Sequence, residues 1–328
     1  MKTNYYLCTF ILYMEDLIFS INVVAPLLVL MAAGYAARRL NFVTDEFMPV
    51  VSRFVFSFLL PLMLFQNIRN IFHGNFVDIS LIFAATIGVS IVIALSLCVV
   101  PLFVKRRGQR GSMIQGIYRS NFVIYGIPLA TGMYGQEAAI PCAILLAVMV
   151  PYYNITGVII LSAFSETRDN RLSFVNLFCN IARNPLIVGC AAGLLFGALG
   201  LDIPAAVNTP IDQLSAAASP LALFLMGGDF KFRRLNNNLW KVFWATAARL
   251  VIVPFVAVLA LIPMGFRSVE LGVLLCVFAT PTAVVSYIMA SNMGCDGELA
   301  GQIVVLTTFA SCFTIFLFIF TLKSCGFL

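Results

Sequence analysis

Long apolar runs, separated only by short polar segments, dominate this sequence. A helix needs about 20 apolar residues to cross a bilayer, and the 328 residues supply ten such runs. Only 10% of the residues are charged, too few to cover a soluble domain. The pattern predicts an all-α integral membrane protein with ten transmembrane helices. The expected spans are residues 17–37, 47–67, 79–104, 112–134, 138–163, 185–200, 210–229, 242–265, 268–292 and 299–322. The sixth is short, and the amphipathic stretch Phe174 to Asn184 is a candidate for its missing length.

The basic residues are sorted by side of the membrane. With the first residue outside, thirteen of the 20 Lys and Arg residues fall in cytoplasmic loops, four fall outside and three lie within spans. Positive residues favour the cytoplasmic side, so both termini are expected outside. The net charge of +6 therefore indicates orientation in a plasma membrane and no nucleic-acid partner.

Few residues are available for catalysis or metal binding. The nine cysteines show no C-x-x-C spacing, and His73 is the single histidine. No Asp or Glu lies plainly at mid-depth in a span, so neither an acid–base pair nor a cation site is assigned. The sequence predicts no enzyme, no cofactor and no metal, and the cysteines are interpreted as small buried apolar residues.

Two short motifs recur at one offset. Pro26-Leu27 with Ala32-Ala33-Gly34 returns 159 residues later as Pro185-Leu186 with Ala191-Ala192-Gly193. The same offset carries the segment that begins at Pro61 onto the one that begins at Pro220. Halves of five spans each must insert in opposite orientations, as in the inverted repeats of secondary transporters. The expected units are a dispensable extension 1–13, a first repeat 14–164, a short cytoplasmic link 165–184 and a second repeat 185–328.

The fourth and ninth expected spans contain helix-breaking residues. In the fourth, polar residues precede Gly126 and Pro128, which suggests a break there. In the ninth, Thr280 suits an N-cap and Pro281 the first residue of a new half-helix. A helix that restarts mid-membrane directs free N–H groups inward and favours an anion, whereas a simple proline kink would only bend the helix.

Two arginines lie within spans without an obvious acidic partner. Arg119 could pair with a substrate carboxylate or extend its side chain to the inner headgroups. Arg249 lies deeper, and it could pair either with a carbonyl of a broken helix or with the substrate. Both remain candidates for the charge partner of a bound anion.

Several motifs together resemble the auxin efflux carrier family, which includes the plant PIN-FORMED auxin exporters and bacterial permeases. The motifs extend from about residue 14 to the end of the chain. They are Asn22-Val23-Val24-Ala25-Pro26, Pro61-Leu62, Asn121-x4-Gly126-Ile127-Pro128-Leu129 with Met133-Tyr134-Gly135, Asn184-Pro185, and Ala279-Thr280-Pro281-Thr282-Ala283 with Ala290.

The resemblance implies two inverted five-helix repeats in which broken helices four and nine cross near the substrate. Spans one, two, six and seven would form a scaffold, and the other six a transport domain. The substrate-binding residues it implies are Asn121, Gly126, Pro128, Thr280, Pro281, Thr282 and, at the uncertain break of helix nine, Ser286.

Two features depart from the plant pattern. Ser286 stands where plant relatives have a second proline, which leaves the break of helix nine open. The link after span five is short, so regulation through a long loop is not implied.

The resulting hypothesis is a permease for small organic anions, such as mono- or dicarboxylates, that works by alternating access. An anion channel is the main alternative, and a membrane-embedded enzyme is a weaker one. Whether the chain acts alone or as a homodimer is open.

The charge distribution predicts the topology. Reporters fused after Leu40, Arg110 and Arg234 should read cytoplasmic, and one fused at the C-terminus should read external. A cytoplasmic C-terminus would require one span more or fewer than ten.

The first 13 residues precede the earliest family-like motif, and Met14 offers a second start. A chain that begins at Met14 should therefore insert and transport like the full chain. The yield in membranes and the uptake of labelled substrate test this, and loss of either on truncation would contradict it.

Overall fold

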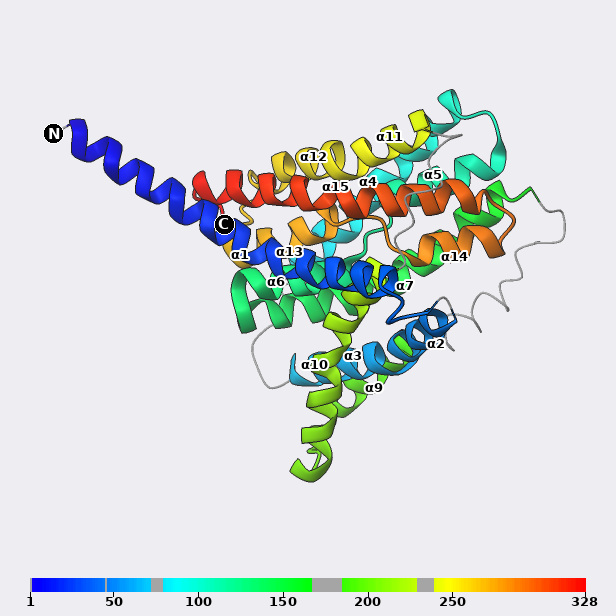
Figure 1. Cartoon of the computed structure of the whole chain (residues 1–328), viewed down its shortest axis with the longest axis horizontal. Helices are drawn as coiled ribbons and strands as arrows, with labels where there is room; N and C mark the ends of the chain where they lie inside the picture. Colours follow the sequence, from blue (N-terminus) through cyan, green and yellow to red (C-terminus); the bar gives the residue numbers. More distant parts are fainter. Residues whose placement is uncertain (1, 45, 72–78, 167–184, 229–238) are drawn as a thin grey trace.

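The computed structural model describes all residues except 1, 45, 72–78, 167–184 and 229–238. Its described part is helical and contains no strand longer than a single bridge pair. Figure 1 shows the arrangement. The helical elements are α1 (Lys2–Arg39), α2 (Phe47–Phe54), η1 (Val55–Leu59), α3 (Leu60–Ile71), α4 (Ile79–Phe103), α5 (Arg107–Tyr118), η2 (Phe122–Gly126), α6 (Ile127–Tyr134), η3 (Gly135–Ala138), α7 (Ala139–Phe164), α9 (Pro185–Ala198), α10 (Ala205–Gly228), α11 (Leu239–Ala247), η5 (Ala248–Ile252), α12 (Val253–Leu261), α13 (Ser268–Ala279), α14 (Val285–Asn292) and α15 (Gly297–Ser324).

Six helical segments of the described chain are long and apolar enough to cross a membrane. A helix satisfies its own backbone groups, so it is the form that apolar runs adopt in lipid. One segment, Phe122–Phe164, joins the second half of the fourth expected span to the fifth, although Gly135 with φ +56° interrupts it. The six are Met14–Arg39, Phe47–Gln66, Ile79–Phe103, Phe122–Phe164, Leu239–Leu261 and Gly297–Ser324. The multi-pass membrane class is thus confirmed, and the full set of ten spans stays a prediction.

The elements fall into two groups that lie against each other. Helices α1, α2, α3, α9 and α10 form one group, in which α1 packs on α10 and α3 packs on α9. Helices α4 to α7 and α11 to α15 form the other. The groups meet where α1 contacts α6 and α15, and where α3 contacts α7. The expected link 165–184 and the stretch Phe174 to Asn184 lie almost wholly outside the described residues.

Glycines allow the backbones of the first group to touch. A Cβ atom on Gly34 of α1 would collide with the carbonyl oxygen of Phe224 on α10. A Cβ on Gly189 of α9 would collide with the carbonyl of Pro61 on α3. Small residues that permit such close approach are typical of helix packing in membranes, where packing replaces the hydrophobic driving force.

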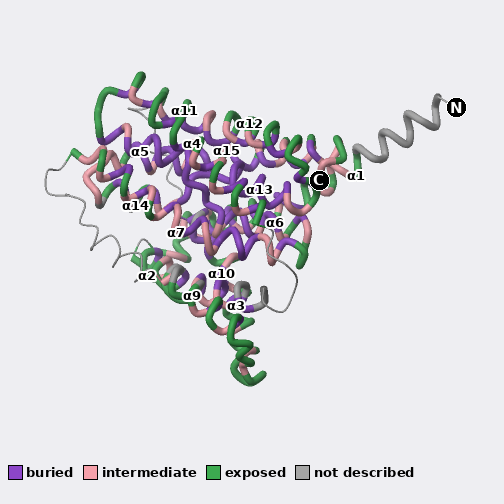
Figure 2. Tube along the Cα trace, turned by 180° about the vertical axis from the view of Figure 1, so that it is seen from behind, coloured by how far each residue is buried: buried purple, intermediate pink, exposed green. Residues whose placement is uncertain are grey.

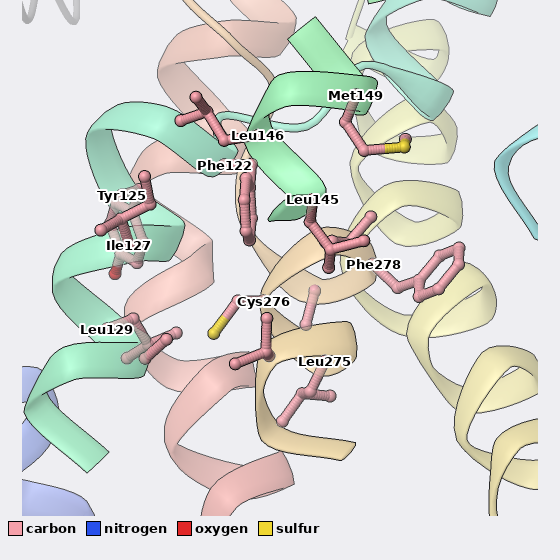
Figure 3. Close-up of a cluster of buried hydrophobic side chains, with 14 of the residues drawn as sticks. Phe122, Tyr125, Ile127, Leu129, Leu145, Leu146, Met149, Leu275, Cys276 and Phe278 are labelled. Atoms are coloured by element: carbon pink, nitrogen blue, oxygen red, sulfur yellow. The ribbon is translucent and has the colours of Figure 1, made fainter. Parts of the chain in front are cut away.

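The buried core lies mainly in the second group. Figure 2 shows the buried residues concentrated around α5, α7, α13 and α15, with exposed residues on the outer helices. Figure 3 shows apolar side chains from η2, α6, α7 and α13 packed together, including Tyr125, Leu129, Leu145 and Cys276. This cluster adjoins two helix interruptions and holds them in place.

Candidate functional site

Two interrupted helices cross at the centre of the second group. α5 ends at Tyr118 and η2 begins at Phe122, while α13 ends at Ala279 and α14 begins at Val285. The two links run antiparallel and form a bridge pair between Ser120 and Thr282. The Asn121 N–H donates to the carbonyl of Pro281 at 2.9 Å, and the Ala283 N–H donates to the carbonyl of Arg119 at 3.1 Å.

The first interruption lies earlier than the sequence suggests. Gly126 and Pro128 were expected at the break, but they lie inside the second half-helix, which runs from Phe122 to Tyr134. The π-helical turn η2 widens the helix before Pro128, so its ring is accommodated without a break. Gly126 instead makes room for the ring of Phe122, because a Cβ there would lie 2.7 Å from Phe122 Cδ2.

The second interruption also differs in detail from the expected N-cap. Thr280 ends α13: its hydroxyl donates back to the carbonyl of Cys276 at 2.8 Å. Pro281 lies in the extended link, and the new half-helix begins four residues later, at Val285. Ser286, at the start of α14, is almost fully buried, and no partner for its hydroxyl lies among the described residues.

Arg249 satisfies the carbonyl ends of both interrupted helices. It lies in the π-helical turn η5 and is 1% exposed. Its Nε donates to Thr280 O at 2.8 Å and its Nη2 to Val277 O at 3.0 Å, both at the end of α13. Its Nη1 lies 3.4 Å from Ile117 O and 3.3 Å from Tyr118 O, at the end of α5. A cation at two helix C-termini matches the negative ends of both helix dipoles. Of the two roles left open for Arg249, the carbonyl partner is the one observed here.

Three threonines and a serine complete the hydrogen bonding of the links. Thr282 Oγ1 donates to Gly116 O at 2.6 Å, and the Thr282 N–H donates to Thr307 Oγ1 at 3.2 Å. The hydroxyls of Ser120 and Thr280 lie 2.6 Å apart. Because backbone groups buried in lipid must be paired, these contacts are what allows extended chain at this depth.

Arg119 turns away from the headgroups and into the protein. It is 6% exposed, so the extended conformation toward the inner headgroups is not the one observed. Its Nη1 donates to Tyr153 O at 3.0 Å and contacts Met289 Sδ at 3.1 Å, and its Nη2 donates to Asn154 Oδ1 at 2.7 Å. Arg119 thus ties the first link to α7 and α14. A thioether is a weak acceptor, so this guanidinium is less fully satisfied than that of Arg249.

The second half-helices begin on either side of the bridge pair, η2 after Asn121 and α14 after Val284. The first hydrogen bonds of η2 are donated by Tyr125 and Gly126 to Asn121 O. The N–H groups of residues 122–124 therefore lie before the first hydrogen bond within this half-helix. Asn121 is 3% exposed and forms the N-terminal boundary of this half-helix. Among the described residues no carboxylate pairs with Arg119 or Arg249, and the ion pair found there, Arg106 with Glu166, is exposed. The site is therefore positive.

The sequence did not point to some of the buried polar residues near the crossing. Thr307 and Thr308 form a polar pair inside α15, and Gln115 is fully buried with an unpaired Oε1 among the described residues. Polar residues inside an apolar run were the signal that could have identified them, as they did Arg119 and Arg249.

Cysteines and candidate metal ligands are scattered over the described part of the chain. This part contains no group of three His, Cys, Asp or Glu side chains that could hold a metal ion. Free thiols are found at Cys98, Cys142, Cys276, Cys295, Cys312 and Cys325, of which Cys98 and Cys325 are exposed. Cys295, in the loop before α15, donates to Leu161 O, and burial together with Glu166 and Asp296 raises the pKa of its thiol to about 11. This thiol stays protonated at neutral pH.

Removing Arg249 should destabilise the crossing itself. In Arg249→Met four carbonyl oxygens lose their donor, and we expect a loss of about 3 kcal/mol or more, because each buried acceptor left unpaired costs about 1–3 kcal/mol. Arg249→Lys should recover only part, because an ammonium cannot span both helix ends as the guanidinium does. Thermal unfolding in detergent without ligand measures this. Arg53→Met, at an exposed position of α2, is the control, and equal stability of the two Met variants would refute the role.

Comparisons with known proteins identify the family. Residues 19–319 match the family model described as membrane transport protein. A "Putative malonate transporter" of Rhizobium meliloti is 24% identical over 92% of this chain and 96% of its own. Uncharacterised transporters of Methanothermobacter thermautotrophicus and Methanocaldococcus jannaschii are each 23% identical, over 89% and 88% of this chain and 95% and 94% of theirs. With nearly all of its length matched, the chain belongs to the membrane transport protein family, the auxin efflux carrier family that its motifs resemble.

Proposed function

We propose that this protein is a secondary transporter of small organic anions that works by alternating access across the plasma membrane. The observation that carries the proposal is the crossing of two interrupted helices, where buried positive charge lies without a carboxylate among the described residues. A membrane transporter rather than an enzyme is what the family and the names of the relatives indicate.

The charge distribution at the crossing favours a negative ligand. The C-terminal ends of α5 and α13 are occupied by Arg249. No described side chain caps the N-terminal ends of η2 and α14, and each presents N–H groups and the positive end of a dipole. An anion bound beside Asn121 and Ser286 would satisfy these donors. We place the substrate there, with Thr280, Pro281 and Thr282 shaping the link beside it.

A small dicarboxylate is our preferred substrate class. The Rhizobium relative carries a name that refers to malonate, and it matches this chain over most of its length. The N-terminal ends of η2 and α14, on the two sides of the crossing, would offer donors to the two carboxylate groups of a short dianion. Arg119 contributes long-range positive charge from behind the first link, since its own hydrogen bonds go to α7 and α14.

The packing of the repeated motifs supports ten spans in two inverted repeats. The Pro26 motif of the first half lies on α1, and α1 packs on α10, which carries the Pro220 motif of the second half. In the same way the Pro185 motif of the second half lies on α9, and α9 packs on α3, which carries the Pro61 motif of the first half. A twofold relation between halves produces this exchange. Both chain ends lie on the same side of the molecule in Figure 1, as an even number of crossings requires.

Carrier and channel predict different flux behaviour. In vesicles loaded with unlabelled malonate, a carrier accelerates the uptake of labelled malonate by counterflow, whereas a channel only dissipates the gradient. We expect counterflow. A thermal-shift screen of mono- and dicarboxylates, with and without sodium, would first select the ligand, because binding to the folded state raises its stability.

Asn121→Ala should weaken substrate binding more than it weakens folding. Loss of one hydrogen bond to a charged group corresponds to roughly 1.5–3 kcal/mol, or about 10- to 150-fold in affinity. Titration of the best ligand from the screen measures the affinity, and thermal unfolding without ligand measures stability. Gln213→Ala, which removes an exposed amide on α10, is the control.

If Asn121 only ties the crossing together, unliganded stability should collapse along with binding. An affinity within about twofold of the parent's, a difference of about 0.4 kcal/mol in binding free energy, would also show that Asn121 does not bind the substrate.

A further inference from the structure

A long apolar groove lies on the side of the second group that faces away from α9 and α10 (Figure 1). Its walls are α4 and the helix formed by η5 and α12, and its volume is about 920 Å³. It follows α4 from Ser80 to Val100, which is most of the length of a helix that can cross the membrane. The groove is separate from the N-terminal ends of η2 and α14 at the crossing, because no residue of either element lines it.

The groove opens toward lipid and is closed toward the protein. Its rims carry large apolar side chains that are exposed, such as Ile87 and Leu95 on α4 and Val256 on α12. Its floor carries buried side chains, including Ile117 of α5 and Phe278 of α13. A groove of this kind along a spanning helix can accommodate a flexible hydrocarbon chain.

Phe278 is the reason why the two walls do not close on each other. Figure 3 shows this ring pointing away from the core cluster and toward α12. On the other side the ring lies against α4, where a Cβ on Gly88 would be 2.6 Å from Phe278 Cζ. Small residues such as Gly88 and Ala257 usually bring membrane helices together. Here they border a space that α4 and α12 leave open.

The ends of the groove differ, and this difference orients its occupant. On the α12 wall the lining stops at Ala248, inside the helix, but at the other end it continues past the helix to Met264, Gly265 and Phe266. At that open end Glu270 lines the groove. Arg267 follows the lining residue Phe266 in the chain and does not itself line the groove. Its Nη1 donates to the carbonyls of Ile262 and Phe266, each at 2.7 Å. Charged groups at one end and an apolar channel beyond them match a phospholipid headgroup and its acyl chain.

We propose that the groove between α4 and α12 binds one phospholipid, with an acyl chain along Gly88 and Ala257 and its headgroup at Arg267 and Glu270. The bound chain would fill the space behind the crossing. Its floor residues adjoin the carbonyls that Arg249 holds: Ile117 O itself, and Val277 O next to Phe278. The lipid would therefore support the substrate site from the membrane side and move together with it.

The test compares two tryptophan substitutions on the same helix. Ala257→Trp places an indole inside the groove, whereas Leu259→Trp places it on the exposed face of α12 outside the groove. Each protein is reconstituted in vesicles of phosphatidylethanolamine and phosphatidylglycerol, extracted in detergent, and examined by native mass spectrometry. We expect the parent and Leu259→Trp to retain one phospholipid and Ala257→Trp to lose it. Equal retention by all three, or no retention by the parent, would overturn the proposal.

A second measurement needs no variant. The parent protein in the same vesicles is irradiated with a phosphatidylcholine probe that carries a diazirine near the end of one acyl chain. We expect adducts concentrated on the groove-lining faces of α4 and α12. The exposed aromatic face of α15 at Phe309 and Phe313 is the reference for ordinary lipid contact. Labelling of the two surfaces at equal density would mean that the groove holds only bulk lipid, and the proposal would fail.

Discussion

The bonds from Arg249 to the carbonyl ends of two interrupted helices are the interaction on which the rest of the structure depends. Extended chain inside a membrane protein survives only where its backbone groups find partners. Arg249 supplies donors to Thr280 and Val277 on one side and to Ile117 and Tyr118 on the other. A single side chain thus joins the ends of α5 and α13. Without it, both interruptions would leave acceptors unpaired in an apolar interior, where each such group costs free energy.

The same interaction makes the site asymmetric. The negative ends of the interrupted helices face a cation that belongs to the protein, while among the described residues no side chain caps the positive ends. The ligand that we propose must therefore complement N–H donors, which favours anions over cations. Arg119 adds to this preference because its charge is buried with a carbonyl, an amide oxygen and a thioether as partners. Selectivity for charge arises from which helix ends are already paired, so no carboxylate or metal ion is needed to create it.

The sequence predicted the membrane class and which two helices are interrupted, because apolar length and clustered polar residues are local signals. It misplaces the first break, which it puts at Gly126 and Pro128. It locates the second correctly at Thr280 and Pro281, but assigns these residues to the start of the new half-helix rather than to the end of α13 and the link. Gly126 serves packing against Phe122, and Pro128 is accommodated by a π turn. The break lies at Arg119 to Asn121 because the partners of that segment, Pro281 and Ala283, are more than 150 residues away. Local sequence holds no trace of such pairing. For Arg249 the sequence left two partners open, a carbonyl of a broken helix or the substrate. The three-dimensional structure shows that carbonyls are the partners.

These constraints locate the motion that transport requires. The crossing is a dense network of buried hydrogen bonds between α5, α7, η5, α13 and α15, so it cannot open without exposing several backbone groups at once. The glycine contacts that join α1 to α10 and α3 to α9 are equally tight and fix the first group. Each group is therefore stiff within itself. The contacts between them, such as α1 with α6 and α3 with α7, include buried apolar side chains of the core, which can slide without leaving a polar group unpaired. The alternating access that we propose would then be a shift of one stiff group along the other, with the ligand carried at the crossing.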